Sequence, residues 1–200
     1  MSQNPEQALK PEEMILVGVQ AQLAGRPGVL PAARGLSHFG EHSLGWLGLA
    51  AIGAVLQPKR RRQYVTAGVG AFVAHAASVV IKRIVRRRRP DHPYITVGVG
   101  TPSKLSFPSS HATSSTAGAI LLGRASGVPG GAVLAPAAVV PPMLASRMVL
   151  GVHYPSDVAA GAAIGAVTAL AAIEGERLWA DRAARCSAKD RKNQTKGSDD

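Results

Sequence analysis

Five long stretches without Asp, Glu, Lys or Arg constrain most strongly what this chain of 200 residues can fold into. They cover residues 42–58, 63–81, 105–123, 125–146 and 158–173, and each has about 16 to 22 residues. A helix needs about 20 residues to cross ~30 Å of hydrocarbon. A soluble helical bundle rich in alanine is the alternative, but soluble helices carry a polar stripe, which these runs lack. The runs therefore predict an all-α, polytopic membrane helix bundle of about five transmembrane helices.

The two ends of the chain differ from these runs. Residues 13–34 are too short and too interrupted for a span, so we expect an interfacial or partly inserted helix there. The last 20 residues are polar and charged, which predicts a disordered tail. No Ser/Gly linker divides the rest, so we expect one membrane-embedded domain over residues 1–180 and a tail over residues 181–200.

The overall charge limits the choice of partner. A formal net charge of +11 predicts an acidic partner: nucleic acid, anionic lipid or a phosphate ester. Only 4% of the residues are aromatic, which argues against base stacking and therefore against nucleic acid. Membrane lipids and a lipid-linked phosphate remain as expected partners, and the sequence does not specify an oligomeric state.

Basic loops predict the orientation of the bundle. If five spans alternate, the block PKRRR at 58–62 and the basic tail after Glu174 lie on one side, which the positive-inside rule makes cytoplasmic. The run KRIVRRRRP at 82–90 then falls on the extracytoplasmic side, where orientation does not explain its charge. We therefore expect this run to bind an anion.

Within that run, the position of each cation around the helix predicts which of them can bind one anion together. If the helix continues, Lys82 and Arg89 differ by about 20° around its axis and share a face, with Arg86 between them. Pro90 stops the helix and places Arg89 at its frayed end. The remaining arginines are expected to contact lipid headgroups; they are Arg83, Arg87 and Arg88.

Two further segments carry polar groups at the ends of spans. In FPSSHATSS, 107–115, Ser109 and Ser110 can cap a helix whose free N–H groups attract an anion, and His111 stands beside them. In SRMVLGVHYPSD, 146–157, Arg147 matches phosphate oxygens. His153 and Asp157 lie four residues apart there, so the carboxylate can orient one ring nitrogen while the other faces a substrate.

The predicted topology brings these three segments to one face of the membrane. Together they supply two histidines, an orienting aspartate, three cations and a helix N-terminus. Those groups suit the transfer of a phosphoryl group, which depends on positioning and charge.

The motif HFGEH at 38–42 suggests a different site. It matches H-x-x-E-H, the inverted zinc-protease pattern, but a zinc site needs a further ligand. A helix end at the interface, near the pocket, is the alternative. His75 lies inside a run, ~10 Å deeper than Lys82 on the same stripe, and the roles of His38, Glu41, His42 and His75 stay open.

The three segments resemble the signature motifs of the type-2 phosphatidic acid phosphatase superfamily, which also includes vanadium haloperoxidases. The matching patterns are K-x6-R-P, P-S-x-H and S-R-x5-H-x3-D, and they span residues 82–157. Ser110 departs from the pattern, because many members have glycine there. The N-terminal segment and the short length are similar to the small actinobacterial members of the family.

The resemblance implies a role for each residue. His153 would attack phosphorus to form a phosphohistidine, Asp157 would hold its other nitrogen, and His111 would protonate the leaving oxygen and then activate water. Five residues would surround the phosphate oxygens: Lys82, Arg89, Ser109, Ser110 and Arg147. The resemblance implies no metal and no cofactor.

The resemblance also implies a lipid phosphatase acting on a phosphomonoester. A prenyl-phosphate or phosphoribosyl substrate is preferred because the site lies at the edge of the bilayer. The similarity to the small actinobacterial members implies decaprenylphosphoryl-5-phosphoribose, a precursor of cell-wall arabinan, as one such substrate. Phosphatidate, phosphatidylglycerophosphate and undecaprenyl diphosphate are alternatives. Two other readings are a basic membrane protein that binds anionic lipid without catalysis, and a haloperoxidase, which the membrane spans and short chain disfavour.

Overall fold

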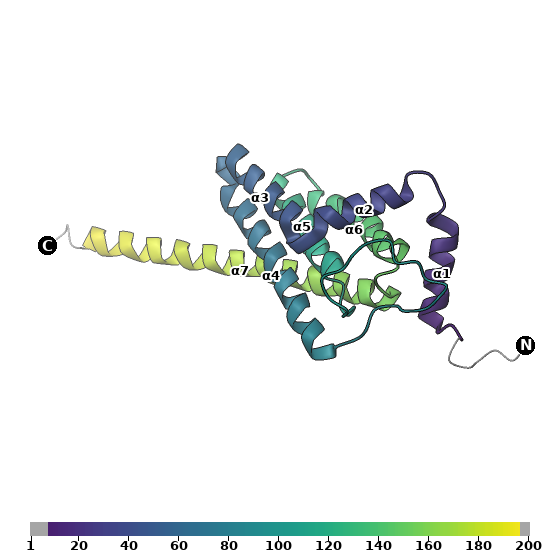
Figure 1. Ribbon diagram of the computed structural model, residues 1–200. Coiled ribbons are helices and arrows are strands. Elements are labelled where there is room, and N and C mark those ends of the chain that lie inside the picture. The colour runs from purple at the N-terminus through teal and green to yellow at the C-terminus, as the bar shows by residue number, and fades with distance from the viewer. Residues whose placement is uncertain (1–7, 197–200) are drawn as a thin grey trace, which may run out of the picture.

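The protein is built from helices joined by loops. The computed structural model describes residues 8–196, with side chains up to residue 186. The helices in this part are α1 (Pro11–Leu23), α2 (Val29–Gly40), α3 (Leu44–Leu56), α4 (Arg61–Val85), α5 (Ser110–Ser126), α6 (Gly131–Val149) and α7 (Pro155–Lys196), with short 3-10 turns at Glu41–Ser43 and Pro58–Arg60 (Figure 1). The predicted all-α architecture is confirmed.

Helix α5 is the centre of the bundle. It packs against α4, α6 and α7, while α3 packs on α4. Most of its residues are small and buried, and Thr113, Ser114 and Ser115 are fully inaccessible. Small residues let helices approach closely, and their hydroxyls bond to backbone oxygens within the turn, as Thr113 Oγ1 does to the Ser109 carbonyl at 2.9 Å.

Two glycines of α7 allow its close contact with α5. A Cβ added at Gly161 would lie 2.7 Å from the Ser109 carbonyl oxygen, and one added at Gly165 would lie 2.3 Å from that of Thr113. Both distances are too short for any side chain. The sequence motif GAAIG thus marks the line along which α7 contacts the central helix.

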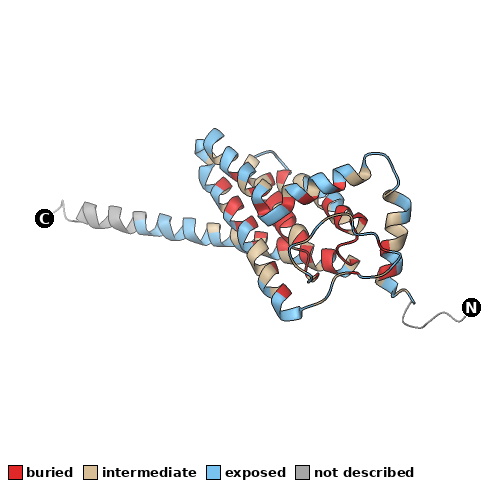
Figure 2. Ribbon diagram, in the orientation of Figure 1, coloured by how far each residue is buried: buried red, intermediate tan, exposed pale blue. Residues whose placement is uncertain are grey.

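The distribution of apolar residues is that of a membrane protein. Four helical segments are long and apolar enough to cross a bilayer: Val29–Leu56, Pro58–Val85, Gly131–Val149 and Pro155–Cys186. Large apolar side chains on their outer surfaces are exposed, among them Val55, Val133 and Val167, while the buried centre holds small residues (Figure 2). At 17 residues, α5 is shorter, and its central position shields it from lipid. The predicted membrane helix bundle is confirmed.

The helix that enters the basic run ends earlier than the sequence predicted. Helix α4 ends at Val85, and Arg86 adopts a left-handed backbone with φ 56°. The expectation that a continuing helix places Lys82 and Arg89 on one face is therefore wrong. Residues 86–109 form a long loop instead, so α5 begins only at Ser110 and not at the start of the uncharged run.

The N-terminal segment forms two helices where one was expected over 13–34. The chain turns at Gly28, whose φ of 80° suits glycine, and α2 follows. Helix α1 packs against α6 and α7 and buries Leu16. Helix α2 meets α3 at a sharp kink, where His42 and Ser43 have φ of 48° and 62°.

Helix α7 continues far beyond the apolar run. Residues 181–196 are helical, whereas the sequence predicted a disordered tail over 181–200, of which residues 197–200 lie outside the described part. Alanine, arginine and lysine are strong helix formers, so a helix that begins in the membrane can extend through this polar sequence.

Candidate active site

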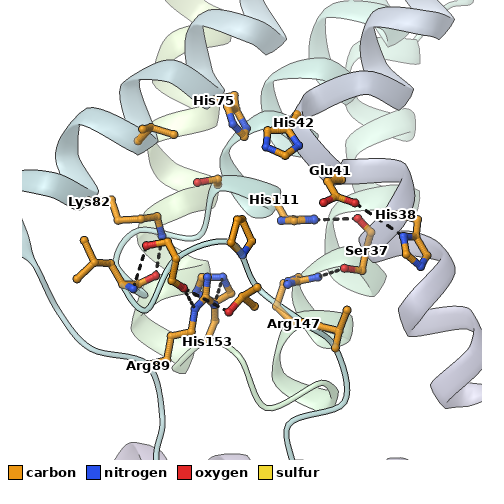
Figure 3. A pocket seen from close by; sticks show the side chains of 18 of the residues that line it. Ser37, His38, Glu41, His42, His75, Lys82, Arg89, His111, Arg147 and His153 are labelled. Carbon is orange, nitrogen blue, oxygen red and sulfur yellow. Dashed lines mark hydrogen bonds and ion pairs between the residues drawn. The ribbon is translucent and has the colours of Figure 1, made fainter.

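One cavity of about 630 Å³ opens where the loop 86–109, the end of α2 and the α6–α7 connection meet. Six of the residues singled out by the sequence line it: Lys82, Arg89, Ser110, His111, Arg147 and His153 (Figure 3). The other two, Ser109 and Asp157, are fully buried directly behind the wall. The structure therefore brings the three sequence segments together.

Lys82 lies in the last turn of α4, and Arg89 lies in the loop that follows it. Lys82 Nζ donates to the carbonyl oxygens of Leu105 at 3.2 Å, Ser106 at 3.0 Å and Pro108 at 2.9 Å, which fixes it against the loop. Arg89 Nε donates to the Ser103 carbonyl at 2.8 Å. Burial lowers the pKa of Arg89 to about 10, so the guanidinium keeps its charge at neutral pH.

The third cation, Arg147, enters from the end of α6. Only 2% of its surface is exposed, and Nη1 donates to the Ser37 hydroxyl at 2.8 Å, while Nε has no hydrogen-bond partner among the described residues. Across residues 8–186, whose side chains are described, Lys82, Arg89 and Arg147 form no ion pair with a carboxylate. Since like charges repel in a partly desolvated site, the cavity favours an anion.

His153 faces these cations with one nitrogen. Its Nε2 lies 3.2 Å from Arg89 Nη1, and because arginine only donates, Nε2 presents its lone pair. The hydrogen of the neutral ring is then on Nδ1, which points toward Asp157 Oδ2 at 3.6 Å. Burial and the charge of Arg89 hold the pKa of His153 well below its usual range, so the ring is neutral and nucleophilic.

Asp157 is held from three sides. Its Oδ2 accepts the Tyr154 N–H at 2.9 Å, and its backbone carbonyl accepts the Ser109 N–H at 3.0 Å, which ties the start of α7 to the start of α5. Its Oδ1 accepts from Arg87 Nη1 at 3.0 Å. These contacts fix the carboxylate beside the ring of His153.

Arg87 was expected to contact lipid headgroups, and the structure corrects this. Its Nη1 also donates to the Ser156 hydroxyl at 2.6 Å, and its Nη2 pairs with Glu12 of α1. The guanidinium lies 4.0 Å above the ring of Tyr154. The left-handed turn at Arg86 redirects the chain and brings Arg87 beneath the site, so helical spacing within the basic run could not identify it.

His111 projects into the cavity from the first turn of α5. Its Nε2 lies 2.9 Å from the Ser37 carbonyl oxygen, which can only accept, so Nε2 carries the hydrogen and Nδ1 is left for proton exchange. Ser37, at the end of α2, thus contacts both His111 and Arg147. Sequence reasoning missed it, because one serine in an apolar helix carries no signal.

The two serines at the start of α5 have different environments. Ser109 is the N-cap, and its hydroxyl accepts from the Ala112 N–H, as the sequence predicted. The Ser110 hydroxyl faces the cavity and accepts from Ser78 Oγ of α4 at 2.7 Å. The N–H groups of Ser110 and His111 have no partner inside the helix and add to the attraction for an anion.

The HFGEH motif does not form the zinc-protease arrangement. His38 lies near the end of α2, 3.8 Å from the Glu41 carboxylate, whereas His42 follows the kink and faces His75 with ring centroids 5.9 Å apart. Among residues 8–196, no group of three or more His, Cys, Asp or Glu side chains is placed to hold a metal ion. The cavity is nevertheless lined by His38, Glu41, His42 and His75.

Comparison with known proteins places this geometry in a family. A family model described as the PAP2 superfamily matches residues 63–178. The chain is 61% identical over 161 residues to the decaprenylphosphoryl-5-phosphoribose phosphatase of Mycobacterium tuberculosis, covering 80% of this chain and 88% of the relative. It is 65% identical over 150 residues to the phosphatase of the same name from Mycolicibacterium smegmatis, covering 75% and 81%.

Two solved structures share the helical fold. One is the transmembrane PAP2-type phosphatidylglycerolphosphate phosphatase from Bacillus subtilis, with a TM-score of 0.67, 17% identity, and coverage of 86% of this chain and 89% of that one. The other is a bacterial vanadium-dependent iodoperoxidase, with a TM-score of 0.67, 18% identity, and coverage of 87% and 51%. At these identities the likeness concerns the fold alone.

Proposed function

The chain belongs to the PAP2 superfamily and is a membrane phosphatase, and we propose that it removes the 5-phosphate from decaprenylphosphoryl-5-phosphoribose. The observation that carries the proposal is the identity of 61% and 65% to two phosphatases of that name. The cationic cavity beside a buried histidine supplies the chemistry. A reading without catalysis would leave His111, His153 and Asp157 without a purpose.

In the first step, His153 Nε2 attacks the phosphorus of the 5-phosphate. The bond between phosphorus and the ribose 5-oxygen breaks, and a phosphohistidine forms. The bound phosphate dianion favours the imidazolium form of His111, which carries a second proton on Nδ1. His111 gives that proton to the departing oxygen, which leaves as the hydroxyl of the lipid-linked ribose. Asp157 stabilises the charge that develops on the ring of His153 and keeps its orientation.

In the second step, water attacks the phosphohistidine. His111, now neutral, takes a proton from that water, the bond between phosphorus and Nε2 breaks, and inorganic phosphate is released with His153 restored. Lys82, Arg89 and Arg147, with the hydroxyl and N–H of Ser110, bind the equatorial oxygens in both steps. Ser109 supports them as the cap of α5. Such preorganised charge is the main source of catalysis in phosphoryl transfer.

The cavity suits a phosphomonoester at the end of a lipid. It is bounded by polar groups at the reacting end and by apolar residues such as Val79 and Leu105, and the exposed surface of the bundle lies in the bilayer. Phosphatidate, phosphatidylglycerophosphate and undecaprenyl diphosphate share the terminal phosphate and remain the alternative substrates. None of them carries the phosphoribose that the two named relatives act on.

The test is phosphate release from a panel of these four lipids in detergent micelles with a chelator present. We expect the wild type to prefer the phosphoribose lipid, and His153→Ala to lose hydrolysis of every lipid. His92→Ala, a change outside the cavity, is the matched control and should keep full activity. Activity retained by His153→Ala would refute the mechanism, and a preference for another lipid would refute the substrate.

We also propose that the active site faces the extracytoplasmic side and that the C-terminus is cytoplasmic. Arg62 and Arg124 both pair with Glu176, so the basic block at 58–62 and the later part of α7 lie at one end of the bundle, which supports a shared side. The positive-inside rule favours the cytoplasm for that end. The loop 86–109, which we call the catalytic loop because it carries Arg89, lies at the other end of α4.

The single cysteine of the chain offers a direct test of this orientation. Cys186 is exposed on α7, and Asp91 is exposed in the catalytic loop. In intact cells, an impermeant maleimide should label Asp91→Cys in a Cys186→Ser background and should label the native Cys186 only after permeabilisation. The reverse pattern would overturn the orientation.

A further inference from the structure

Part of the cavity wall has no task in phosphoryl transfer. His42 and His75 face each other there with ring centroids 5.9 Å apart, and the Glu41 carboxylate lies on the same wall. In Figure 3 these three side chains lie on the opposite side of His111 from Arg89 and His153. We call His42, His75 and Glu41 the second polar wall.

The second polar wall lies between the phosphate site and the interior of the bilayer. His75 precedes Lys82 by seven residues on α4, which places it ~10 Å further along the helix, away from the catalytic loop. His75 Nδ1 is buried and has no hydrogen-bond partner in the described chain. An imidazole inside a membrane span is unfavourable unless it forms a hydrogen bond with a polar group. His75 lines the cavity, so a ligand bound there can supply that group.

The backbone holds this wall in a fixed position beside the catalytic groups. His42 and Ser43 are consecutive residues with left-handed backbone, which costs energy outside glycine and recurs at functional sites. Just before them, Gly40 approaches His111 so closely that an added Cβ would lie 2.7 Å from its ring. The segment that presents Glu41 and His42 is therefore packed directly on the catalytic histidine.

We propose that the second polar wall binds the sugar hydroxyls that separate the reacting phosphate from the lipid, an inference that rests on the proposed function. A carboxylate accepts hydrogen bonds from hydroxyls, and a neutral imidazole both accepts and donates, so the three groups suit vicinal hydroxyls. Glu41 would repel a phosphate placed directly against this wall, so the wall fits the uncharged hydroxyls, and the phosphate that joins the ribose to the decaprenyl chain lies away from it. The wall thus selects a phosphorylated sugar on a lipid over a phosphate attached directly to the lipid.

The test compares two substrates with the same polyprenyl chain, decaprenylphosphoryl-5-phosphoribose and decaprenyl monophosphate. His75→Phe keeps an aromatic ring and removes both nitrogens, including the buried Nδ1, so a sugar hydroxyl bound there loses its hydrogen-bond partner. We expect kcat/KM for the ribose substrate to fall about ten- to hundredfold, and kcat/KM for decaprenyl monophosphate to change less than about threefold. His75→Gln should recover part of the loss, because its amide can still bond to a hydroxyl.

Two further variants separate binding from folding. Phe72→Leu changes a lipid-exposed residue of the same helix and should leave both substrates unaffected. His42→Asn introduces a residue that also tolerates the left-handed backbone, and it should reduce kcat/KM selectively for the ribose substrate.

The outcomes distinguish the inference from the proposed function. An equal loss on both substrates in His75→Phe, or no loss on the ribose substrate, would overturn the second polar wall as a sugar site. Equal kcat/KM values of the wild type for decaprenyl monophosphate and for the ribose substrate would also overturn the sugar site, but the proposed phosphatase activity would stand. A wild type that cleaves neither would overturn both.

Discussion

Arg87 provides the sharpest test of how the active site is held together. Its guanidinium donates to the buried Asp157 carboxylate at 3.0 Å and to Ser156 at 2.6 Å, and it pairs with Glu12 of α1. It does not line the catalytic cavity, so it acts on the reaction only through the carboxylate that orients His153. Arg87→Met keeps the length of the side chain and its packing over Tyr154 while it removes these hydrogen bonds.

The magnitude follows from the environment of the pair. A hydrogen bond to a charged group contributes about 1.5–3 kcal/mol, and because the Arg87 side chain is 30% exposed, solvent screening reduces this to about 1–2 kcal/mol. At about 1.4 kcal/mol for each factor of ten, kcat should fall roughly 5- to 30-fold. KM should stay unchanged, because no contact of the cavity wall is lost.

The assay is steady-state phosphate release from the lipid substrate in micelles, with kcat and KM determined separately. Arg88→Met is the matched control, because Arg88 is the exposed neighbour in the same basic run, and it should behave as the wild type. Arg87→Lys should fall between, since an ammonium cannot bridge both partners in the way that the planar fork does. A wild-type kcat in Arg87→Met, or a raised KM at unchanged kcat, would refute the reasoning.

Three other expectations concern pH, packing and inhibition. Burial and the charge of Arg89 keep the pKa of His153 well below 6.5; Arg89→Gln removes a charge that disfavours the protonated ring, so this pKa rises. The acidic limb of the kcat/KM profile should move to higher pH, and an unmoved limb would contradict this assignment. Gly165→Ala forces α7 away from α5, which costs about 1–3 kcal/mol and should lower the midpoint of thermal unfolding in detergent by about 2–12 °C. Gly175→Ala, with open space around it, should not change the midpoint, and equal shifts would refute the contact. Orthovanadate should inhibit competitively and a chelator should not inhibit, so non-competitive inhibition or loss of activity with chelator would exclude the proposed site.

The fold class was readable from the sequence because uncharged runs of membrane length have few other stable solutions. The two glycines of GAAIG lie where α7 contacts α5, since a Cβ added at either position would come 2.7 or 2.3 Å from a backbone oxygen of Ser109 or Thr113. The sequence did not reveal that α5 is shielded at the centre, because hydropathy does not say which helix faces lipid. The helical extension over residues 181–196 also exceeded the prediction, because local helix propensity outweighed polarity.

The residues of the candidate site could be named from spacing, but their neighbours could not. Histidine and aspartate four apart, or serine at a helix start, are local patterns, and the structure keeps His153 beside Asp157 and Ser109 as a cap. Ser37 and Glu12 lie more than 70 residues from the groups they contact, and nothing in their own surroundings along the chain marks them.

The sequence by itself determined that this is a membrane helix bundle with cations and histidines at the ends of its spans, because hydropathy and short spacings are properties of local stretches of the chain. Only the tertiary structure decided which side chain each cation contacts. The left-handed turn at Arg86 ends α4, so Arg89 reaches His153 from a loop while Arg87 supports Asp157 from below. The path of a loop depends on contacts made across the whole bundle, and no periodicity along the chain encodes it.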